Sequence, residues 1–451
     1  QMTSSRLALC LLAVFLTAVL PLHADPAADR VRVIVAVGLP EMSARSDQAI
    51  SADARAVAIA ALRSDVLETL QYATEVEQWG SGPAFSAVIR RDALDRLARD
   101  PRVRAVSIDN GGEGALMDSV PLIGADLVHA QGFDGRGVTV AVLDSGIDAK
   151  SPDFAGRIAA QQCFCDNLDG TGCCPNGEVE QSGNDAALDD NGHGTHVTGI
   201  LAGGGATAPR GVAPGARIVA VKVLDFNRGF RSFTQTYRAL EWIASKRPDV
   251  KVINMSFGSW STYKTSECDR DAIALGMQDL ITALRRRGVL VVASAGNQSA
   301  ADGTTLPSCM ADVLGVGATY DAPVHTQTPC AADSDRDDMT CFSNSSAAID
   351  LLAPGAVITA AARGGGFTTM SGTSMAAPHV AGALALMQQV SAGTITADQA
   401  ETILKTTGHP IHDPRNGLAF PRLDAAAAVA ATPHVAPPPA PPPTKRRSTK
   451  K

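Results

Sequence analysis

The sequence predicts an α/β fold in which helices cover both faces of a parallel sheet, preceded by a smaller α+β domain. Apolar runs of strand length recur from about residue 120, and helical stretches such as TQTYRALEWIASK separate them. The runs are VTVAVLD (138–144), RIVAVKVLD (217–225), VKVINMSFG (251–258), VLVVASAGN (289–297) and LGVGAT (314–319). Continuous apolar strands that alternate with helices are typical of a parallel sheet that is buried on both sides. Ligands bind beyond the carboxyl ends of such strands, so the polar residues there are the candidate functional residues.

A different pattern precedes this region. Residues 31–38 alternate like a strand, a helical pattern follows over 51–71, and EVEQW…AFSAVI reads as strand. A helix (RDALDRLARD) and a last strand (RVRAVSID) complete the segment. The order strand, helix, strand, strand, helix, strand predicts a compact ferredoxin-like α+β domain over 25–112. The loose stretch GGEGALMDS (111–119) is interpreted as a linker.

Length and charge bound the class of protein. A chain of 451 residues predicts two or three domains. The formal net charge of −7 argues against nucleic acid or an anionic membrane as a partner. Aromatic residues make up only 4% of the chain, which argues against an aromatic surface for stacking bases.

The two ends of the chain read as segments outside the fold. Residues 1–24 combine a basic stretch, the apolar run LALCLLAVFLTAVLPL and a small-residue exit, which predicts a signal peptide cleaved after Ala24. The alternative, a permanent anchor, needs roughly 20 apolar residues, and the run is shorter. Residues 431–451 are rich in proline with a basic end, which is typical of an extended tail.

Export makes the cysteines informative. Without Cys10 the even number that remains favours disulfides over free thiols; the residues are Cys163, Cys165, Cys173, Cys174, Cys268, Cys309, Cys330 and Cys341. Cys330 with Cys341, which closes a short acidic loop, is the pairing we predict first, and the other pairings stay open. A zinc site in the cluster 163–174 is the alternative, weakened by the absence of a paired CxxC.

Reactive side chains stand at the predicted strand ends and helix starts. Asp144 closes one strand, His193 begins a helical run with glycines on both sides, and Asn297 ends another strand. Ser374 stands at the start of a helical run, where unpaired N–H groups stabilise developing negative charge. Each residue alone has a simpler interpretation, as a turn former, a metal ligand with His196, or a helix cap. Together they supply an alcohol nucleophile, a base and an orienting carboxylate.

Four segments carry a family resemblance: VAVLDSGID, NGHGTHVTG, SAGN and GTSMAAPHV resemble the signature blocks of the subtilisin-like serine proteases. The resemblance covers about 120–430, with the blocks in order. It implies a three-layer catalytic domain over 113–430, with Asp144, His193 and Ser374 as catalytic triad and Asn297 as oxyanion donor. From its own position at a helix start, His196 is interpreted as a packed histidine, and Pro378 is expected in the first turn of the helix of Ser374.

The resemblance also implies substrate-binding residues. INMSFGS resembles the strand on which a peptide lies as an added β-strand, so Ser256, Phe257 and Gly258 are expected to pair with substrate through their backbone. The opposite wall of the pocket is expected from Ala293, Ser294, Ala295 and Gly296. Neither stretch contains an acidic residue, which favours an apolar pocket over one that selects basic residues. Phe230 and Phe233 either line the pocket further back or simply pack beneath their loop.

The leading α+β domain resembles an inhibitory propeptide that also assists folding. Self-cleavage is then expected within 109–119. The long cysteine-rich insert 161–190 departs from the family pattern and is expected to restrain a loop beside the active site. Asp166, Asn167 and Asp169, and the acidic run 332–338, are candidate calcium ligands, with a solvated acidic loop as the alternative. No cofactor is expected for the chemistry itself.

We therefore expect a secreted serine endopeptidase that acts on protein or peptide substrates, works at neutral to alkaline pH, and is a monomer without a membrane anchor. Two alternatives remain at this point. One is a processing protease of narrow specificity, and the other is an inactive subtilase fold that binds proteins.

Overall fold

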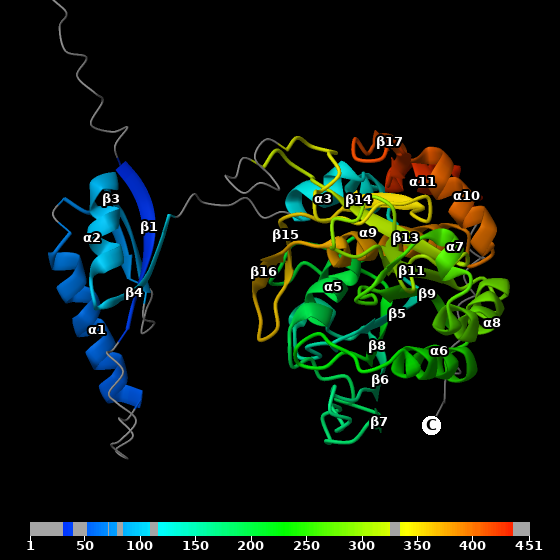
Figure 1. Cartoon of the computed structure of the whole chain (residues 1–451), viewed down its shortest axis with the longest axis horizontal. Helices are drawn as coiled ribbons and strands as arrows, with labels where there is room; N and C mark the ends of the chain where they lie inside the picture. Colours follow the sequence, from blue (N-terminus) through cyan, green and yellow to red (C-terminus); the bar gives the residue numbers. More distant parts are fainter. Residues whose placement is uncertain are drawn as a thin grey trace, which may run out of the picture. The chain divides into compact units, whose positions relative to one another are not determined.

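The computed structural model describes residues 30–38, 52–70, 72–78, 84–108, 116–324 and 334–435. The chain divides into two compact units, Gln1–Gly112 and Glu113–Lys451 (Figure 1). The predicted signal peptide, the tail beyond residue 435 and most of the predicted cleavage region lie outside the described residues.

The first unit contains one antiparallel sheet and helices. Its elements are β1 (Arg30–Val37), α1 (Ala52–Glu68), β2 (Thr74–Gln78), β3 (Ala84–Arg90), a short 3₁₀ turn (Arg91–Ala93), α2 (Leu94–Arg99) and β4 (Val103–Ile108). The strand order is β2-β3-β1-β4, which places the first strand beside the last. Val33, Val35 and Phe85 are fully buried in one apolar cluster with residues of the helices. The order of elements is the one that the sequence predicts.

The second unit is organised around one large, mostly parallel sheet in the order β17-β18-β14-β13-β11-β9-β5-β8-β6-β7. Neighbours from β18 to β6 run parallel, and the edge strands β17 and β7 pair antiparallel. The strands are β5 (Thr139–Asp144), β6 (Ile158–Phe164), β7 (Glu180–Ser182), β8 (Arg217–Lys222), β9 (Val250–Met255), β11 (Leu290–Ser294), β13 (Val313–Thr319), β14 (Leu351–Pro354), β17 (His409–His412) and β18 (Ala419–Arg422). Two small hairpin-like pairs lie outside it, β10 (Thr262–Tyr263) with β12 (Thr304–Thr305) and β15 (Ile358–Ala361) with β16 (Phe367–Met370).

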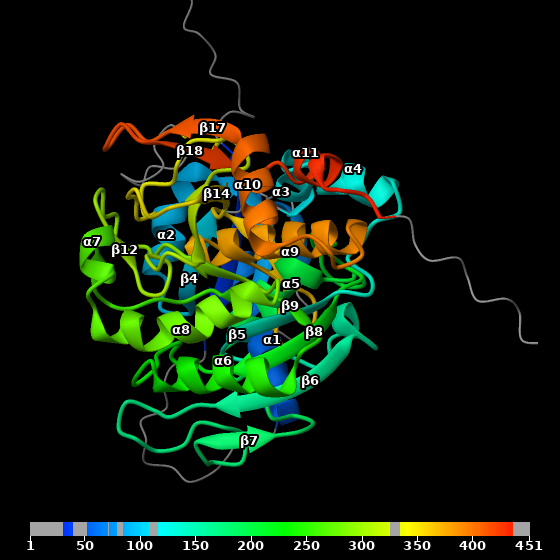
Figure 2. The same cartoon turned by 90° about the vertical axis from the view of Figure 1, so that its right-hand side faces the viewer.

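Helices cover both faces of this sheet, with α5 and α9 on one side of the strands and α6 and α8 on the other (Figure 2). The alternation of side chains along β5 shows the division: Val140 and Val142 pack in the cluster of α5 and α9, while Ala141 and Leu143 pack in the cluster of α6 and α8. The helices are α3 (Leu116–Leu122), α4 (Ala125–Ala130), α5 (His193–Ala202), α6 (Thr234–Lys246), α7 (Thr265–Cys268), α8 (Ala272–Arg286), α9 (Thr373–Val390), α10 (Ala397–Thr407) and α11 (Ala425–Ala431), with a 3₁₀ turn at Pro152–Phe154.

Two details differ from the sequence prediction. The stretch 111–119 is not a linker throughout, because α3 begins at Leu116. Ser119 is fully buried there and donates to Nε2 of His379 on α9 at 2.9 Å, so the start of the second unit packs against the helix of Ser374. Pro378 is the sixth residue of α9 and therefore lies in the second turn, since the helix begins at Thr373.

Candidate active site

A cleft of about 340 Å³ lies at the carboxyl ends of the central strands. His193, Asn297 and Ser374 line it, although they come from three separate parts of the sequence. A parallel sheet brings these ends to one edge, because every strand that contributes runs in the same direction. The sequence-predicted reactive residues are thus brought together.

Asp144 and His193 are in direct contact. Oδ1 of Asp144 lies 2.7 Å from Nδ1 of His193, and both side chains are buried. The same oxygen accepts the N–H of Ser145 at 2.7 Å. A carboxylate bound to one ring nitrogen of a neutral histidine holds the proton there and leaves the other nitrogen as a base.

Glycine permits the close approach of the two segments that carry this pair. A Cβ atom on Gly194, next to His193 in α5, would lie 2.2 Å from the carbonyl oxygen of Gly146. No side chain fits at that distance, so the turn after β5 and the start of α5 can pack only with glycine at this position.

Ser374 is the second residue of α9, and Gly372 precedes the helix with φ of 155°. This backbone conformation favours glycine, and it presents the serine at the helix N-terminus. The Ser374 hydroxyl donates to the carbonyl oxygen of Ser256 at 3.0 Å. The described side chains of His193 and Ser374 are not hydrogen-bonded to each other.

Asn297 is oriented by Thr373. Oδ1 of Asn297 accepts the Thr373 N–H at 2.9 Å and is 3.0 Å from its hydroxyl. Because the carbonyl end of this amide is held in that way, its NH₂ group remains as the donor end in the cleft. An NH₂ group beside a nucleophile is suited to an oxyanion.

The predicted substrate-binding residues divide into two groups. Ser256, Phe257, Gly258, Ser294 and Gly296 line the cleft. Ala293 and Ala295 do not, since both are fully buried in apolar clusters. The reason is the alternation of extended backbone, which directs every second side chain away from the cleft.

Phe230 lies where the cleft meets a larger apolar cavity of about 770 Å³, to which Phe233 also contributes. The Phe230 ring packs edge-on against Phe233 and Phe257, with ring centroids 4.9 and 5.6 Å apart. The two rings therefore pack on each other and line the larger cavity, and their contribution to a substrate pocket stays a prediction. Trp260, with 82% of its surface exposed, lines both spaces and was not predicted.

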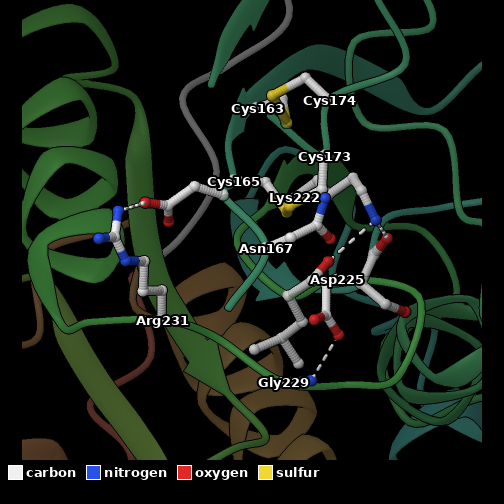
Figure 3. The surroundings of a disulfide bond; sticks show 12 residues. Cys163, Cys165, Asn167, Cys173, Cys174, Lys222, Asp225, Gly229 and Arg231 are labelled. Atoms are coloured by element: carbon white, nitrogen blue, oxygen red, sulfur yellow. Dashed lines mark hydrogen bonds and ion pairs between the residues drawn. A yellow bond between two sulfur atoms is a disulfide. The ribbon is translucent and has the colours of Figure 1, made fainter. Parts of the chain in front are cut away.

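The cysteine-rich insert is closed by two disulfides, Cys163–Cys174 and Cys165–Cys173 (Figure 3). These bonds take the cysteines that the alternative zinc site would need. Leu168, between the paired cysteines, lines the larger cavity and is 67% exposed. The insert therefore borders the larger cavity, and its expected restraint of a loop beside the active site stays a prediction.

The other described cysteines also form disulfides. Cys268 is bonded to Cys309, and both lie in the apolar cluster between the sheet and helices α6 and α8. Cys341 is also disulfide-bonded, and its predicted partner Cys330 lies outside the described residues.

Asp169 and Asp166 have other partners, although Oδ1 of Asp166 is buried without a hydrogen bond. Asp169 accepts hydrogen bonds from the N–H and the hydroxyl of Thr171, and Asp166 lies 3.7 Å from Arg231. Within the described part of the chain no cluster of His, Cys, Asp and Glu is arranged to hold a metal ion, and residues 332 and 333 lie outside it. His196 is fully buried with Nε2 3.0 Å from two carbonyl oxygens, and burial lowers its pKa to about 4.

Two buried charged residues beside the cleft were missed by sequence analysis. Asp189, 1% exposed, accepts hydrogen bonds from Ser145 and from the backbone around His193. Lys222 is fully buried, and its ammonium donates to Asp190 at 2.8 Å and to the carbonyl oxygens of Ser145 and Leu224 (Figure 3). The one sequence signal for these residues was the acidic pair Asp189-Asp190 directly before the His193 block. Such a pair is also typical of an ordinary solvated turn.

Comparison with known proteins agrees with this geometry. Residues 135–428 match the model of the subtilase family. The chain is 32% identical over 311 residues to a thermostable alkaline protease of Halalkalibacterium halodurans, covering 68% of this chain and 72% of the relative. It is 32% identical over 309 residues to subtilisin E of Bacillus subtilis, covering 67% and 70%.

A solved structure of a cold-adapted subtilisin-like serine proteinase matches with a TM-score of 0.50 at 29% identity, covering 65% of this chain and 90% of the other. The described residues include no helix long and apolar enough to cross a membrane. The second unit thus has the subtilisin-like fold, and the chain belongs to the subtilase family of serine endopeptidases.

Proposed function

We propose that this protein hydrolyses peptide bonds through Asp144, His193 and Ser374, with an acyl-enzyme intermediate. The observation that carries the proposal is the Asp144–His193 contact in the cleft that Ser374 and Asn297 also line. Ser374 Oγ attacks the carbonyl carbon while Nε2 of His193 takes its proton. The proton passes to the leaving amine as the C–N bond breaks, and water then releases the acyl group by the same route.

Charge develops on the substrate oxygen during each step. The NH₂ group of Asn297 and the N–H of Ser374 at the start of α9 are the donors that we assign to it. The substrate is expected to lie beside Ser256, Phe257 and Gly258 as an added strand, with Ser294 and Gly296 opposite. These atoms supply the nucleophile, base and oxyanion donors, so we propose that the reaction needs no cofactor.

The test is covalent labelling by a peptidyl phosphonate, located by mass spectrometry. We expect one phosphonyl group on Ser374 in the matured protein and none in the Ser374→Ala variant. A folded, matured protein that resists labelling would favour the inactive binding fold. Cleavage mapping on a mixed peptide library then separates broad degradation from processing of one sequence.

We further propose that the first unit is an inhibitory propeptide removed by the enzyme itself within 109–119, and that the protein is exported. The two-unit division of the chain and the disulfides support this proposal. Ser374→Ala produced in a protease-free host should accumulate as the uncut precursor. Normal processing of that variant would refute self-cleavage.

Asp166, Asn167 and Asp169 are the candidate ligands for a structural calcium ion. We propose that these side chains need no calcium ion, since Asp169 accepts two hydrogen bonds from Thr171 and Oδ2 of Asp166 lies 3.7 Å from Nη1 of Arg231. Melting curves with a calcium chelator and with added calcium test this directly. A fall in the melting temperature with chelator would assign calcium to the fold.

A further inference from the structure

Asp189 is a buried carboxylate whose oxygens are occupied by donors from both segments that form the Asp144–His193 pair. Oδ1 accepts the hydroxyl of Ser145 at 2.9 Å and the N–H groups of Asn191 and Gly192 at 3.1 and 2.8 Å. Oδ2 accepts the N–H of Thr195 at 2.9 Å and its hydroxyl at 2.5 Å.

Ser145 connects Asp189 to Asp144. Its N–H donates to Oδ1 of Asp144 at 2.7 Å, and its hydroxyl oxygen accepts the N–H of Gly194 at 2.9 Å while donating to Asp189. The N–H groups on either side of His193 are therefore held by Asp189 or by Ser145. Ser145 and Asp189 are 44 residues apart in sequence. One small network thus fixes the end of β5 against the start of α5.

The carboxylate remains ionised in this environment. Burial alone would raise the pKa of Asp189, but hydrogen bonds from Thr195, Gly192 and Ser145 outweigh it and lower the pKa below its ordinary value. A buried acceptor with several donors is rigid, because releasing any one donor leaves a polar group unpaired in the interior.

We propose that Asp189, acting through Ser145, is a positioning residue that sets the geometry of the Asp144–His193 pair. This inference rests on the proposed function. Asp189 is bonded to the backbone around His193 and to the neighbour of Asp144, so its effect is on where the imidazole lies. An error of about 1 Å in such a group costs up to about 10²-fold in rate.

The test is Asp189→Asn in the full chain, matured and counted by phosphonate titration of active sites. An amide keeps the volume but directs an NH₂ group at donors such as Thr195, which lose their acceptor. We expect kcat per active site to fall by about 10- to 100-fold while KM changes less than about twofold. The acid limb of the kcat/KM profile should move to lower pH, because a negative charge that favours the imidazolium is removed.

Asp153 provides a matched control. It is also fully buried, and its carboxylate accepts the N–H of Ala206 at 2.7 Å and both the N–H and the hydroxyl of Thr207, beyond the other end of α5. Asp153→Asn should lower the melting temperature by about as much as Asp189→Asn does. Its kcat per active site and its pH profile should stay those of the wild type.

A second variant, Ser145→Ala, tests the same network if Asp189→Asn does not fold. Ser145→Ala removes only the hydroxyl that joins the two segments, and we expect kcat to fall by about 3- to 10-fold. An unchanged kcat and acid limb in both Asp189→Asn and Ser145→Ala would overturn the proposal, as would the same changes in Asp153→Asn. Failure of the proposed function is distinguishable, because the wild-type protein itself would then resist phosphonate labelling.

Discussion

Ser256 and Ser374 exchange two hydrogen bonds across the cleft. The Ser374 hydroxyl donates to the carbonyl oxygen of Ser256 at 3.0 Å, and the Ser256 hydroxyl donates to the carbonyl oxygen of Ser374 at 2.9 Å. The second bond has a simple cause. In a regular helix that carbonyl accepts the N–H of residue 378, but proline has none. Ser256 supplies the missing donor and so connects the segment after β9 to the first turn of α9.

Replacing Ser256 with alanine tests this link. The Ser374 carbonyl would lose its donor, and an unpaired buried group costs about 1–3 kcal/mol. We expect kcat/KM to fall by about 10-fold or more. Ser308→Ala is the control, because Ser308 is a fully buried hydroxyl bonded to the carbonyl of Thr305 and does not line the cleft. Equal losses in the two variants would mean that the effect is general destabilisation.

Asn297→Ala removes the amide that we assign to the oxyanion. Removal of one such donor in subtilisin lowers kcat on the order of 10²–10³-fold, and we expect a similar loss with little change in KM. Thr373→Val leaves the amide in place and removes a hydroxyl that donates to its Oδ1 and accepts the N–H of Gly296. The loss of kcat in Thr373→Val should be much smaller than in Asn297→Ala. Steady-state kinetics of both variants on one peptide substrate measures the difference.

Phe230→Ala should change substrate preference rather than the chemistry. Phe230 borders both the cleft and the larger apolar cavity, so we expect its ring to contact a substrate side chain upstream of the cut. We expect kcat/KM to fall by about 10-fold for peptides with a large apolar residue there and to change little for peptides with alanine. Leu275→Ala is the control, since this exposed side chain does not line either space. An equal effect on both peptides would contradict a role in specificity.

Two buried histidines set a limit on acid stability. Burial lowers the pKa of His196 and of His379 to about 4, below the ordinary value of 6.5. Below pH 6.5 the unfolded chain binds protons that the folded protein does not, so stability is present above pH 6.5 and is lost as pH falls towards 4. Each residue accounts for about 3 kcal/mol across that window, at about 1.4 kcal/mol per pH unit.

His379→Gln should therefore reduce the dependence of melting temperature on pH between 7 and 4. Glutamine can still meet Met375 and Ser119, the partners of the His379 ring. His409→Gln, at an exposed position on β17, serves as the control and should leave the slope unchanged. Identical slopes in all three proteins would show that His379 does not titrate in this way.

The structure confirms the sequence prediction where one short segment contains both the hydrophobic pattern of an element and the reactive residue at its end. The strand VTVAVLD ends in Asp144 as predicted, and the helix with Ser374 begins within a residue of it. The burial and hydrogen-bond partners of Asp189 and Lys222 could not be predicted, because they arise only when separate segments pack. Ala293 and Ala295 were expected in the cleft because a motif gives order along the chain, whereas side-chain direction depends on the strand's twist and register.

The disulfides should differ in their effect on stability. Cys268–Cys309 joins residues 41 apart, whereas Cys165–Cys173 spans 8 residues inside the loop already closed by Cys163–Cys174. A cross-link stabilises mainly by restricting the unfolded chain, so the longer loop contributes about 4 kcal/mol in that treatment. The nested bond adds less, because its ends are already held near each other.

We therefore expect Cys268→Ala with Cys309→Ala to lower the melting temperature by about 6 °C, because an unfolding entropy of about 2.1 cal/mol/K per residue gives about 1.5 °C per kcal/mol for a domain of more than about 300 residues. Loss of two buried side chains adds to the effect. Cys165→Ala with Cys173→Ala should cause a clearly smaller shift. Calorimetry of the two double variants at one pH makes the comparison, and a larger effect of the nested bond would show that it holds native structure in the insert rather than restricting the unfolded chain.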